Sequence, residues 1–310
     1  LSIRDPTKRQ ALRFSWAWAD LEQPDGEYAV TNALEPDALG WAVGAHQTPG
    51  GRVALFLAEE PFGFAGGTEV VVRLAYRSVY AQHALGRVRL SLGKLEAAGL
   101  DALPAAASDW LVAGPFATEP APAGYTASFG PELDLALDRT RDFADQKWRF
   151  VQRFPDGRLN GELDAGVNVH YLGRRLFVPS ARTVSVALGS DDGYRLFLDG
   201  VEVSSRQVDR ALGAAQDQLE LTLTAGTHTL AFEVVNTGGA AGFTWKPARR
   251  EAELTGELAF ALLPSGARTS EREHALALAW RLAFSADYRA HMERIPAAEK
   301  ELAELEAATP

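Results

Sequence analysis

Two adjacent aspartates, Asp191 and Asp192, are the side chains of this sequence whose type and spacing best suit metal chemistry. They lie in the stretch GSDDGYRLFLDG, which has alternating apolar residues on both sides. Calcium takes carboxylate and carbonyl oxygens, and a turn with two aspartates supplies both. The same residues also suit a turn in which each carboxylate bonds nearby amides, and that alternative stays open. The following Asp199-Gly200 is typical of a tight hairpin turn.

Aromatic and basic residues in glycine-flanked segments are the candidates for ligand binding, because sugar rings stack on Trp and Tyr side chains. Trp41 and His46 lie in LGWAVGAH, and His83 and Arg87 lie in QHALGRVR. Burial in a core is the alternative for the aromatics, and ion pairing in solvent is the alternative for the arginine. The predicted ligand-binding residues are Trp41, His46, His83, Arg87 and Tyr194.

No constellation in the sequence predicts catalysis. The six histidines are scattered, and neither His-x-x-x-His, Gly-x-Ser-x-Gly nor a phosphate-binding glycine loop is present. Cysteine is absent, which excludes disulfides, thiolate catalysis, zinc-thiolate sites and the Cys-x-x-Cys-His attachment of haem. We therefore expect a chain that is not an enzyme and carries no haem.

The charge balance argues against a nucleic-acid partner. The 310 residues include 41 acidic and 31 basic side chains, giving a net charge of −10, and no basic cluster is visible. No apolar run reaches the ~18 to 20 residues that span a bilayer, so no membrane span is expected. Because the chain starts at Leu1 without signal-peptide features, we expect a piece of a larger protein.

The elements that would position these residues are mainly strands. Apolar residues alternate over Glu69–Tyr76 and Arg87–Leu92, and again over 183–188, 194–198, 219–223 and 229–234. Many short strands with little helix between them favour an all-β sandwich. The Ala-rich stretch Leu95–Ser108, broken by Pro104, is the best domain boundary.

The last segment changes to a helical pattern. Ser270-Glu-Arg-Glu273 fits a capping box, and Pro296 fits the first turn of a second helix over Ala297–Ala307. The prediction is therefore two β-sandwich domains, residues 1–100 and 101–265, followed by a helical segment, residues 266–310.

The first region carries a family resemblance. The segments ADLEQPDGEYAVTNALEPDALGWAVGAH and QHALGRVRLSLG resemble the central region of large planctomycete proteins that carry a cytochrome-c-like domain and two planctomycete domains of unknown function. In those proteins the segment looks like a galactose-binding-type jelly roll. The C-terminal YRAHMERIPAAEKELAELEAATP is similar to the helical spacer of the same family.

The second region resembles sugar-binding modules. DWLVAGPF, YLGRRLFVP, LGSDDGYRLFLDGVEV and LTAGTHTLAFEVVN are similar to a jelly-roll module of that family and to accessory domains of glycosidases. Ser-Asp-Asp-Gly followed by Asp-Gly is also similar to protective-antigen-type lectin domains, where paired aspartates hold a calcium ion that binds sugar hydroxyls.

These resemblances imply two jelly-roll modules that act as a non-catalytic, carbohydrate-binding part of an exported, extracytoplasmic protein. Its partners would then be a glycan and the flanking domains of the parent protein. Two alternatives stay open: modules that only space and orient those flanking domains, and part of a glycosidase or redox enzyme. Because the haem motif is absent, no redox role is carried over to this chain.

Overall fold

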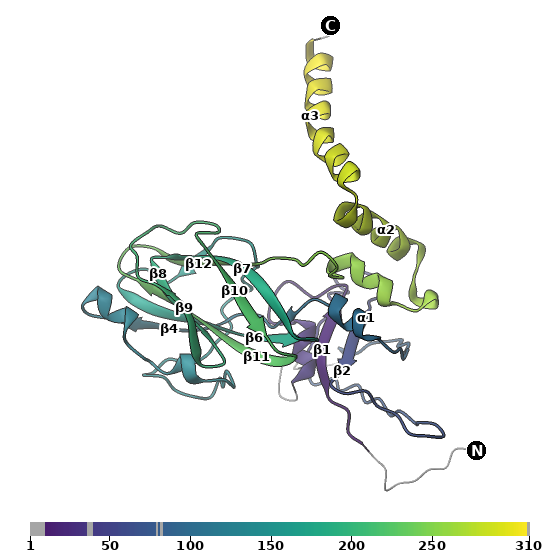
Figure 1. Cartoon of the computed structure of the whole chain (residues 1–310), viewed down its shortest axis with the longest axis horizontal. Helices are drawn as coiled ribbons and strands as arrows, with labels where there is room; N and C mark the ends of the chain where they lie inside the picture. Colours follow the sequence, from purple (N-terminus) through teal and green to yellow (C-terminus); the bar gives the residue numbers. More distant parts are fainter. Residues whose placement is uncertain (1–9, 36–39, 79, 81–82, 309–310) are drawn as a thin grey trace. The chain divides into compact units, whose positions relative to one another are not determined.

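The chain divides into two compact units, shown in Figure 1. The computed structural model describes residues 10–35, 40–78, 80 and 83–308. The first unit consists of the described residues up to Val88 together with Ala105–Ala248. The second unit consists of Arg89–Pro104 and Arg249–Pro310. The predicted domain boundaries at residues 100 and 265 differ from this division and stay predictions about separable domains.

Two antiparallel sheets make up the main part of the first unit. The larger sheet has the strand order β3-β6-β11-β8-β9, with β4 also paired to β6, and the smaller has the order β10-β7-β12-β5. The strands of the larger sheet are β3 (Ala106–Ala107), β4 (Leu111–Ala117), β6 (Asn168–Val178), β8 (Gly193–Leu198), β9 (Val201–Arg206) and β11 (Gly226–Asn236). Those of the smaller sheet are β5 (Asn160–Leu163), β7 (Arg182–Asp191), β10 (Asp217–Leu223) and β12 (Ala241–Pro247).

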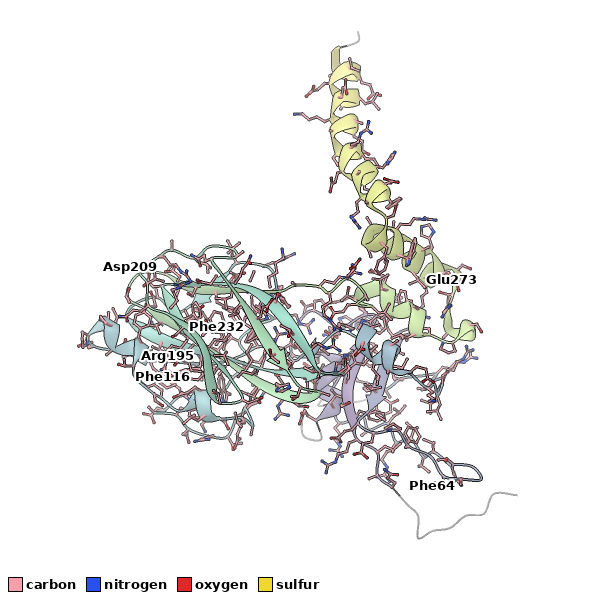
Figure 2. The ribbon with its side chains drawn as sticks, in the orientation of Figure 1. Phe64, Phe116, Arg195, Asp209, Phe232 and Glu273 are labelled. Carbon is pink, nitrogen blue, oxygen red and sulfur yellow. The ribbon has the colours of Figure 1, made fainter. Side chains whose placement is uncertain are left out.

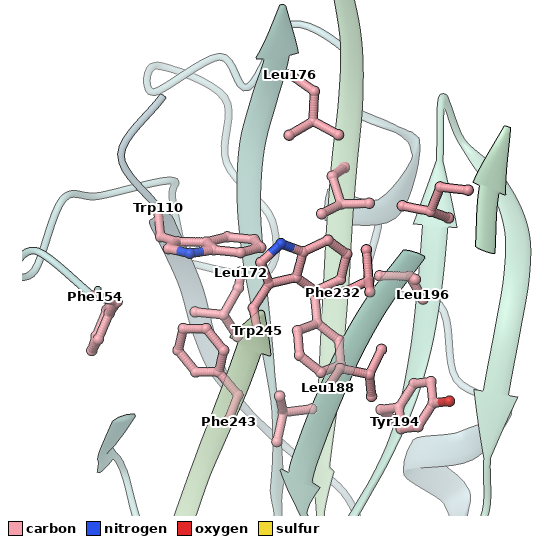
Figure 3. Close-up of a cluster of buried hydrophobic side chains, with 14 of the residues drawn as sticks. Trp110, Phe154, Leu172, Leu176, Leu188, Tyr194, Leu196, Phe232, Phe243 and Trp245 are labelled. Atoms are coloured by element: carbon pink, nitrogen blue, oxygen red, sulfur yellow. The ribbon is translucent and has the colours of Figure 1, made fainter. Parts of the chain in front are cut away.

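A core of apolar side chains from both sheets fills the space between them. Leu172 of β6, Leu188 of β7 and Phe232 of β11 are wholly buried in it. Trp110 meets Trp245 edge-on, with 5.9 Å between the ring centroids (Figure 3). The two sheets therefore form a β-sandwich around one hydrophobic core.

The larger sheet is buried on its other face as well. Segment 118–150, which contains the 3-10 helices η2 (Ala121–Tyr125) and η3 (Pro131–Leu133), contributes Trp148 to a second core cluster with Tyr171 of β6. Gly173 permits this packing, because a Cβ atom there would overlap the ring of Trp148. Strands β6 and β11 are therefore buried almost throughout instead of on alternate residues.

The strands predicted in the second region are confirmed. The predicted segments 183–188, 194–198, 219–223 and 229–234 fall within β7, β8, β10 and β11. The alternation that predicted β7 and β10 matches half-buried strands of the smaller sheet.

The first region differs from its prediction. It holds a two-stranded sheet, β1 (Phe14–Ala19) with β2 (Ala54–Ala58), and the 3-10 helix η1 (Val30–Leu34). Segments 69–76 and 87–92 are not strands, and side chains such as Val71 and Leu92 are 84% and 72% exposed. A segment with alternating apolar residues forms a strand only where another segment pairs with it. None of the described residues pairs with 69–76 or 87–92 in this way. The described residues form one sandwich, and the presence of two jelly rolls stays a prediction.

Helices dominate the second unit. They are α1 (Ala97–Ala102), the 3-10 helices η4 (Gly256–Leu262) and η5 (Ser265–Ala267), α2 (Ser270–Phe284) and α3 (Ala286–Ala308). The predicted start at Ser270 is confirmed, although the capping side chain is that of Thr269, which accepts from the Arg272 amide. The second helix begins at Ala286, so Pro296 lies inside it instead of in its first turn. Among the helices of the described residues, none is both long and apolar enough to cross a membrane.

Candidate functional site

Asp192 occupies a corner where the chain passes from one sheet of the sandwich to the other. Strand β7 ends at Asp191 in the smaller sheet, and β8 begins at Gly193 in the larger one, so Asp192 alone connects them. Two of the other connections that cross between the sheets also reach this corner: residues 207–216 from β9 to β10, and residues 237–240 from β11 to β12.

The Asp192 carboxylate bonds both of these connections. Oδ1 accepts from the Arg210 amide at 2.9 Å, and Oδ2 accepts from the Thr237 amide at 2.8 Å and hydroxyl at 2.5 Å. Burial acts to raise the pKa of Asp192, but the bonds from Thr237 and Arg210 outweigh it, so its pKa is lowered. Asp192 is therefore ionised at neutral pH and ties three connections together.

The cation at this corner is the guanidinium of Arg210. Its Nε lies 3.4 Å from the Ser190 carbonyl and 3.3 Å from the Asp192 carbonyl. Its Nη2 donates to Ser190 Oγ at 3.1 Å and to Asp217 Oδ2 at 2.7 Å. Asp191 contributes less, since its Oδ2 accepts one bond, from the Leu212 amide at 3.3 Å.

The protein itself already bonds most of the oxygens that Asp191 and Asp192 could offer to a calcium ion. Calcium needs six to eight oxygen ligands with free lone pairs. Three of the four carboxylate oxygens of the pair already accept protein hydrogen bonds, and Arg210 bonds both nearby carbonyls. The described residues also contain no group of three His, Asp or Glu side chains that could hold a metal.

A polar pocket of about 320 Å³ lies on the larger sheet near this corner. It is formed by side chains of β8 and β9, of the residue that follows β9, and of the end of η2. Its volume falls at the lower end of the ~300 to 1,000 Å³ typical of ligand sites. The lining residues are Tyr125, Thr126, Arg195, Glu202, Ser205 and Gln207.

Arg195 on β8, labelled in Figure 2, lines this pocket and also contacts a buried acid. Its Nε donates to Glu202 at 3.0 Å, and its Nη1 donates to the Ala127 carbonyl at 2.9 Å and lies 3.3 Å from Glu233 Oε2. The guanidinium also lies over the Phe197 ring, 4.9 Å from its centroid. Arg195 is therefore held in one orientation from several sides.

Glu233 is a fully buried carboxyl group on β11, with 0% of the residue exposed. Burial raises its pKa to about 8, against the opposing effect of Arg195, and the nearby Glu132 raises it further. Glu233 is therefore mostly protonated at neutral pH. The pocket then contains the charges of Arg195 and Glu202, which balance each other.

Tyr125 links the pocket to the loop that follows β9. Its hydroxyl donates to the Val208 carbonyl at 3.0 Å. Gly193 lies against the Tyr125 ring and the Arg206 carbonyl, where a Cβ atom would overlap both. Tyr125 is thus positioned by the same loop whose Arg210 amide bonds Asp192.

Tyr194, predicted to bind ligand, is a core residue. It is 2% exposed, packs edge-on against Phe232, and its hydroxyl bonds Ser204 Oγ at 3.0 Å. Side chains alternate between the two faces of a strand, so the neighbouring Arg195 faces the pocket instead. The alternation in YRLFL contains this signal, because Tyr194 and Leu196 share the core face.

The other predicted ligand residues all lie before Val88, and none lines the pocket. Trp41 is partly buried and donates its indole N–H to the Leu21 carbonyl at 2.9 Å. His46 is exposed in a turn, His83 is exposed and stacks on Tyr80, and Arg87 is exposed. The structure brings Asp191 and Asp192 together but does not gather the five ligand candidates into one site.

Comparisons with known proteins give distant structural likenesses. No protein-family model and no curated protein matches the chain. The sugar-binding PA14 domain of an RTX adhesin is 17% identical, with 46% of this chain and 71% of that chain covered and a TM-score of 0.22. The PA14 domain of the antifreeze protein MpAFP is 14% identical, with 49% and 70% covered and a TM-score of 0.22.

Two glycoside-cleaving enzymes are also similar to this chain, over a small part of their own length. A β-glucosidase from Kluyveromyces marxianus is 13% identical, with 40% of this chain and 19% of the enzyme covered and a TM-score of 0.27. The chain spans 11% of the length of an α-xylosidase from Xanthomonas citri. At these identities and TM-scores, no function follows from the likeness.

Proposed function

We propose that the sandwich of the first unit binds carbohydrate without chemical change, in the pocket between Arg195 and Glu202. The observation that carries this proposal is the ion pair on the pocket wall, with 3.0 Å between Arg195 Nε and Glu202 Oε2. A guanidinium donates and a carboxylate accepts, so the pair presents a donor beside an acceptor. Neighbouring sugar hydroxyls each donate and accept, and they match such a pair.

The rest of the pocket suits a neutral, polar ligand. Thr126, Ser205 and Gln207 add hydrogen-bonding groups, and Tyr125 adds an aromatic ring. Arg195, Glu202 and Ser205 stand on a sheet whose opposite side is a packed core, so they are held in place before a ligand arrives.

The carboxylates around Arg195 support binding rather than hydrolysis. A glycosidase needs two carboxyl groups about 5 to 10 Å apart that both reach the glycosidic bond. Glu202 lines the pocket, but Glu233, the other acid on Arg195, is wholly buried and cannot reach a substrate. The pocket therefore offers one usable carboxylate.

The setting of the protein is proposed from its resemblance to the planctomycete family. On that basis the chain is part of a larger exported protein, works outside the cytoplasm, and has flanking domains of the parent protein as neighbours. Retention of a cell-surface polysaccharide by the sandwich would suit that setting.

A polysaccharide retention assay with the full chain tests the proposal. We expect retention on at least one glycan, and about tenfold weaker binding, equivalent to ~1.4 kcal/mol, in Glu202→Gln. Glu220→Gln is the matched control, because Glu220 is exposed on β10 of the other sheet. Absence of retention on any glycan, or equal retention by Glu202→Gln and wild type, would reject the proposal and favour the role of a structural spacer.

A further inference from the structure

The corner at Asp192 contains a protein cation, the Arg210 guanidinium, whose hydrogen-bond partners are all oxygen atoms. Its hydrogen-bond partners are the carbonyls of Ser190 and Asp192, the Ser190 hydroxyl and the Asp217 carboxylate, at 2.7 to 3.4 Å. Carbonyl, hydroxyl and carboxylate oxygens are also the ligands that a calcium ion takes. A positive side chain therefore occupies the kind of environment that a bound cation would need.

The guanidinium suits this position because it is planar, permanently charged and has five N–H donors in a fixed arrangement. It reaches several acceptors at once from a side chain that is 18% exposed, and its ion-pair partner Asp217 is 7% exposed. Arg206 supplies a second positive charge to the other oxygen of Asp217, with 2.9 Å between Nη2 and Oδ1. The carboxylate of Asp217 is thereby neutralised within the protein.

The Arg210 backbone completes the closure of the corner. Its amide donates to Asp192 Oδ1 at 2.9 Å, so one residue bonds this corner through both its backbone and its side chain. Two positions earlier, the Val208 carbonyl accepts from the Tyr125 hydroxyl. Fixing Arg210 therefore also fixes the loop on which one wall of the pocket depends.

We propose that Arg210 serves as the built-in cation of this corner, so that the sandwich closes its crossing loops without calcium. The paired aspartates then have separate uses: Asp192 fastens the connections, and Asp191 bonds one amide of the loop. This inference concerns the folding of the corner and holds whether or not the pocket binds a glycan.

The first test is the response of the wild-type full chain to calcium. We expect the same melting temperature in millimolar calcium and in a chelator, and no heat of binding in a calcium titration by calorimetry. A rise in melting temperature with calcium that the chelator reverses would overturn the proposal. This measurement needs no variant, so it stands even where a substitution prevents folding.

The second test removes the guanidinium. Arg210→Gln should lower the melting temperature by about 5 °C, which for a unit of this size corresponds to a loss of ~2 kcal/mol. Arg158→Gln, at an exposed position whose side chain forms no hydrogen bond or ion pair in the described part of the chain, should leave the melting temperature nearly unchanged. Equal melting temperatures for the two variants would overturn the proposal, and a calcium-dependent gain confined to Arg210→Gln would support it further.

Discussion

Oδ2 of Asp192 accepts hydrogen bonds from both the amide and the hydroxyl of Thr237, at 2.8 and 2.5 Å. Thr237 follows β11, whereas Asp192 precedes β8, so the pair joins two connections that cross between the sheets. The other carboxylate oxygen bonds the Arg210 amide in the third such connection. One ionised side chain therefore joins three connections at this corner.

The two neighbouring aspartates should differ sharply in their effect on stability. Asp192→Ala leaves the amides of Arg210 and Thr237 without an acceptor and should cost about 2 to 4 kcal/mol. Asp191→Ala removes one long bond and should cost less than ~1 kcal/mol. Urea unfolding measures both free energies. Similar losses for the two variants would contradict the assignment of the corner to Asp192.

The buried Glu233 should make the sandwich less stable as the pH rises. Burial raises the folded-state pKa to about 8 from an ordinary value of 4.5, so the folded state holds this proton more tightly than the unfolded chain. Its favourable contribution is complete below pH 4.5 and is lost as the pH rises toward about 8. In Glu233→Gln this dependence should disappear, because the amide has a similar shape and does not titrate.

Melting temperatures at several pH values compare this variant with wild type. Glu233→Gln should melt higher than wild type at pH 8 to 9, by roughly 3 °C or more, and the difference should shrink toward pH 5. Glu220→Gln, on an exposed position of β10, should follow wild type throughout. A constant difference between Glu233→Gln and wild type at all pH values would show that Glu233 does not titrate in this range.

Apolar alternation in the sequence predicted the strands well where one face of the strand packs on the core. Period-two alternation located β7, β8, β10 and β11, because each of these has at least one face on the core. The bonds of Asp192 run to residues 18 and 45 positions away, and no local motif indicates such partners. The sequence therefore identified the paired aspartates as unusual turn residues. Their hydrogen-bond partners could not be predicted, because these partners lie in loops distant in sequence.

The pocket was hidden from sequence reasoning for a similar reason. Arg195 and Glu202 are seven residues apart on paired strands. In the sequence, this spacing looks the same as that of an ordinary exposed ion pair across a hairpin. Glu233 lies in a strand buried on both faces, so alternation does not separate a core position from a polar one there. In the first region, segments 69–76 and 87–92 show the opposite case, since a clear alternation there has no strand partner in the described residues.

Asp199 has a larger part in its hairpin than the Asp-Gly turn alone requires. Its backbone φ is +52°, its Oδ1 accepts from the Thr229 amide at 2.8 Å, and its Oδ2 lies 2.6 Å from His228 Nδ1. Asp199→Asn keeps an acceptor and tolerates the left-handed backbone, so it should cost less than ~1 kcal/mol. Asp199→Ala loses the acceptor and the tolerance of the left-handed backbone, and it should cost about 2 kcal/mol by urea unfolding. An Asn variant as unstable as the Ala variant would show that the His228 contact dominates.

Gly193 is expected to control both stability and ligand binding, because it lies against Tyr125. A Cβ atom there would overlap the Tyr125 ring and the Arg206 carbonyl, so Gly193→Ala must displace the tyrosine or strand β9. Overpacking of this kind costs roughly 1 to 3 kcal/mol. Because Tyr125 lines the pocket, retention on glycan should fall in the same variant.

Gly161→Ala provides the matched control for this substitution. Gly161 lies on β5 and has no atom within 4 Å of an added Cβ, so its stability and glycan retention should match wild type. Urea unfolding and the retention assay are read together on both variants. A Gly193→Ala protein that unfolds and binds like Gly161→Ala would show that the Tyr125 position is not fixed by this contact.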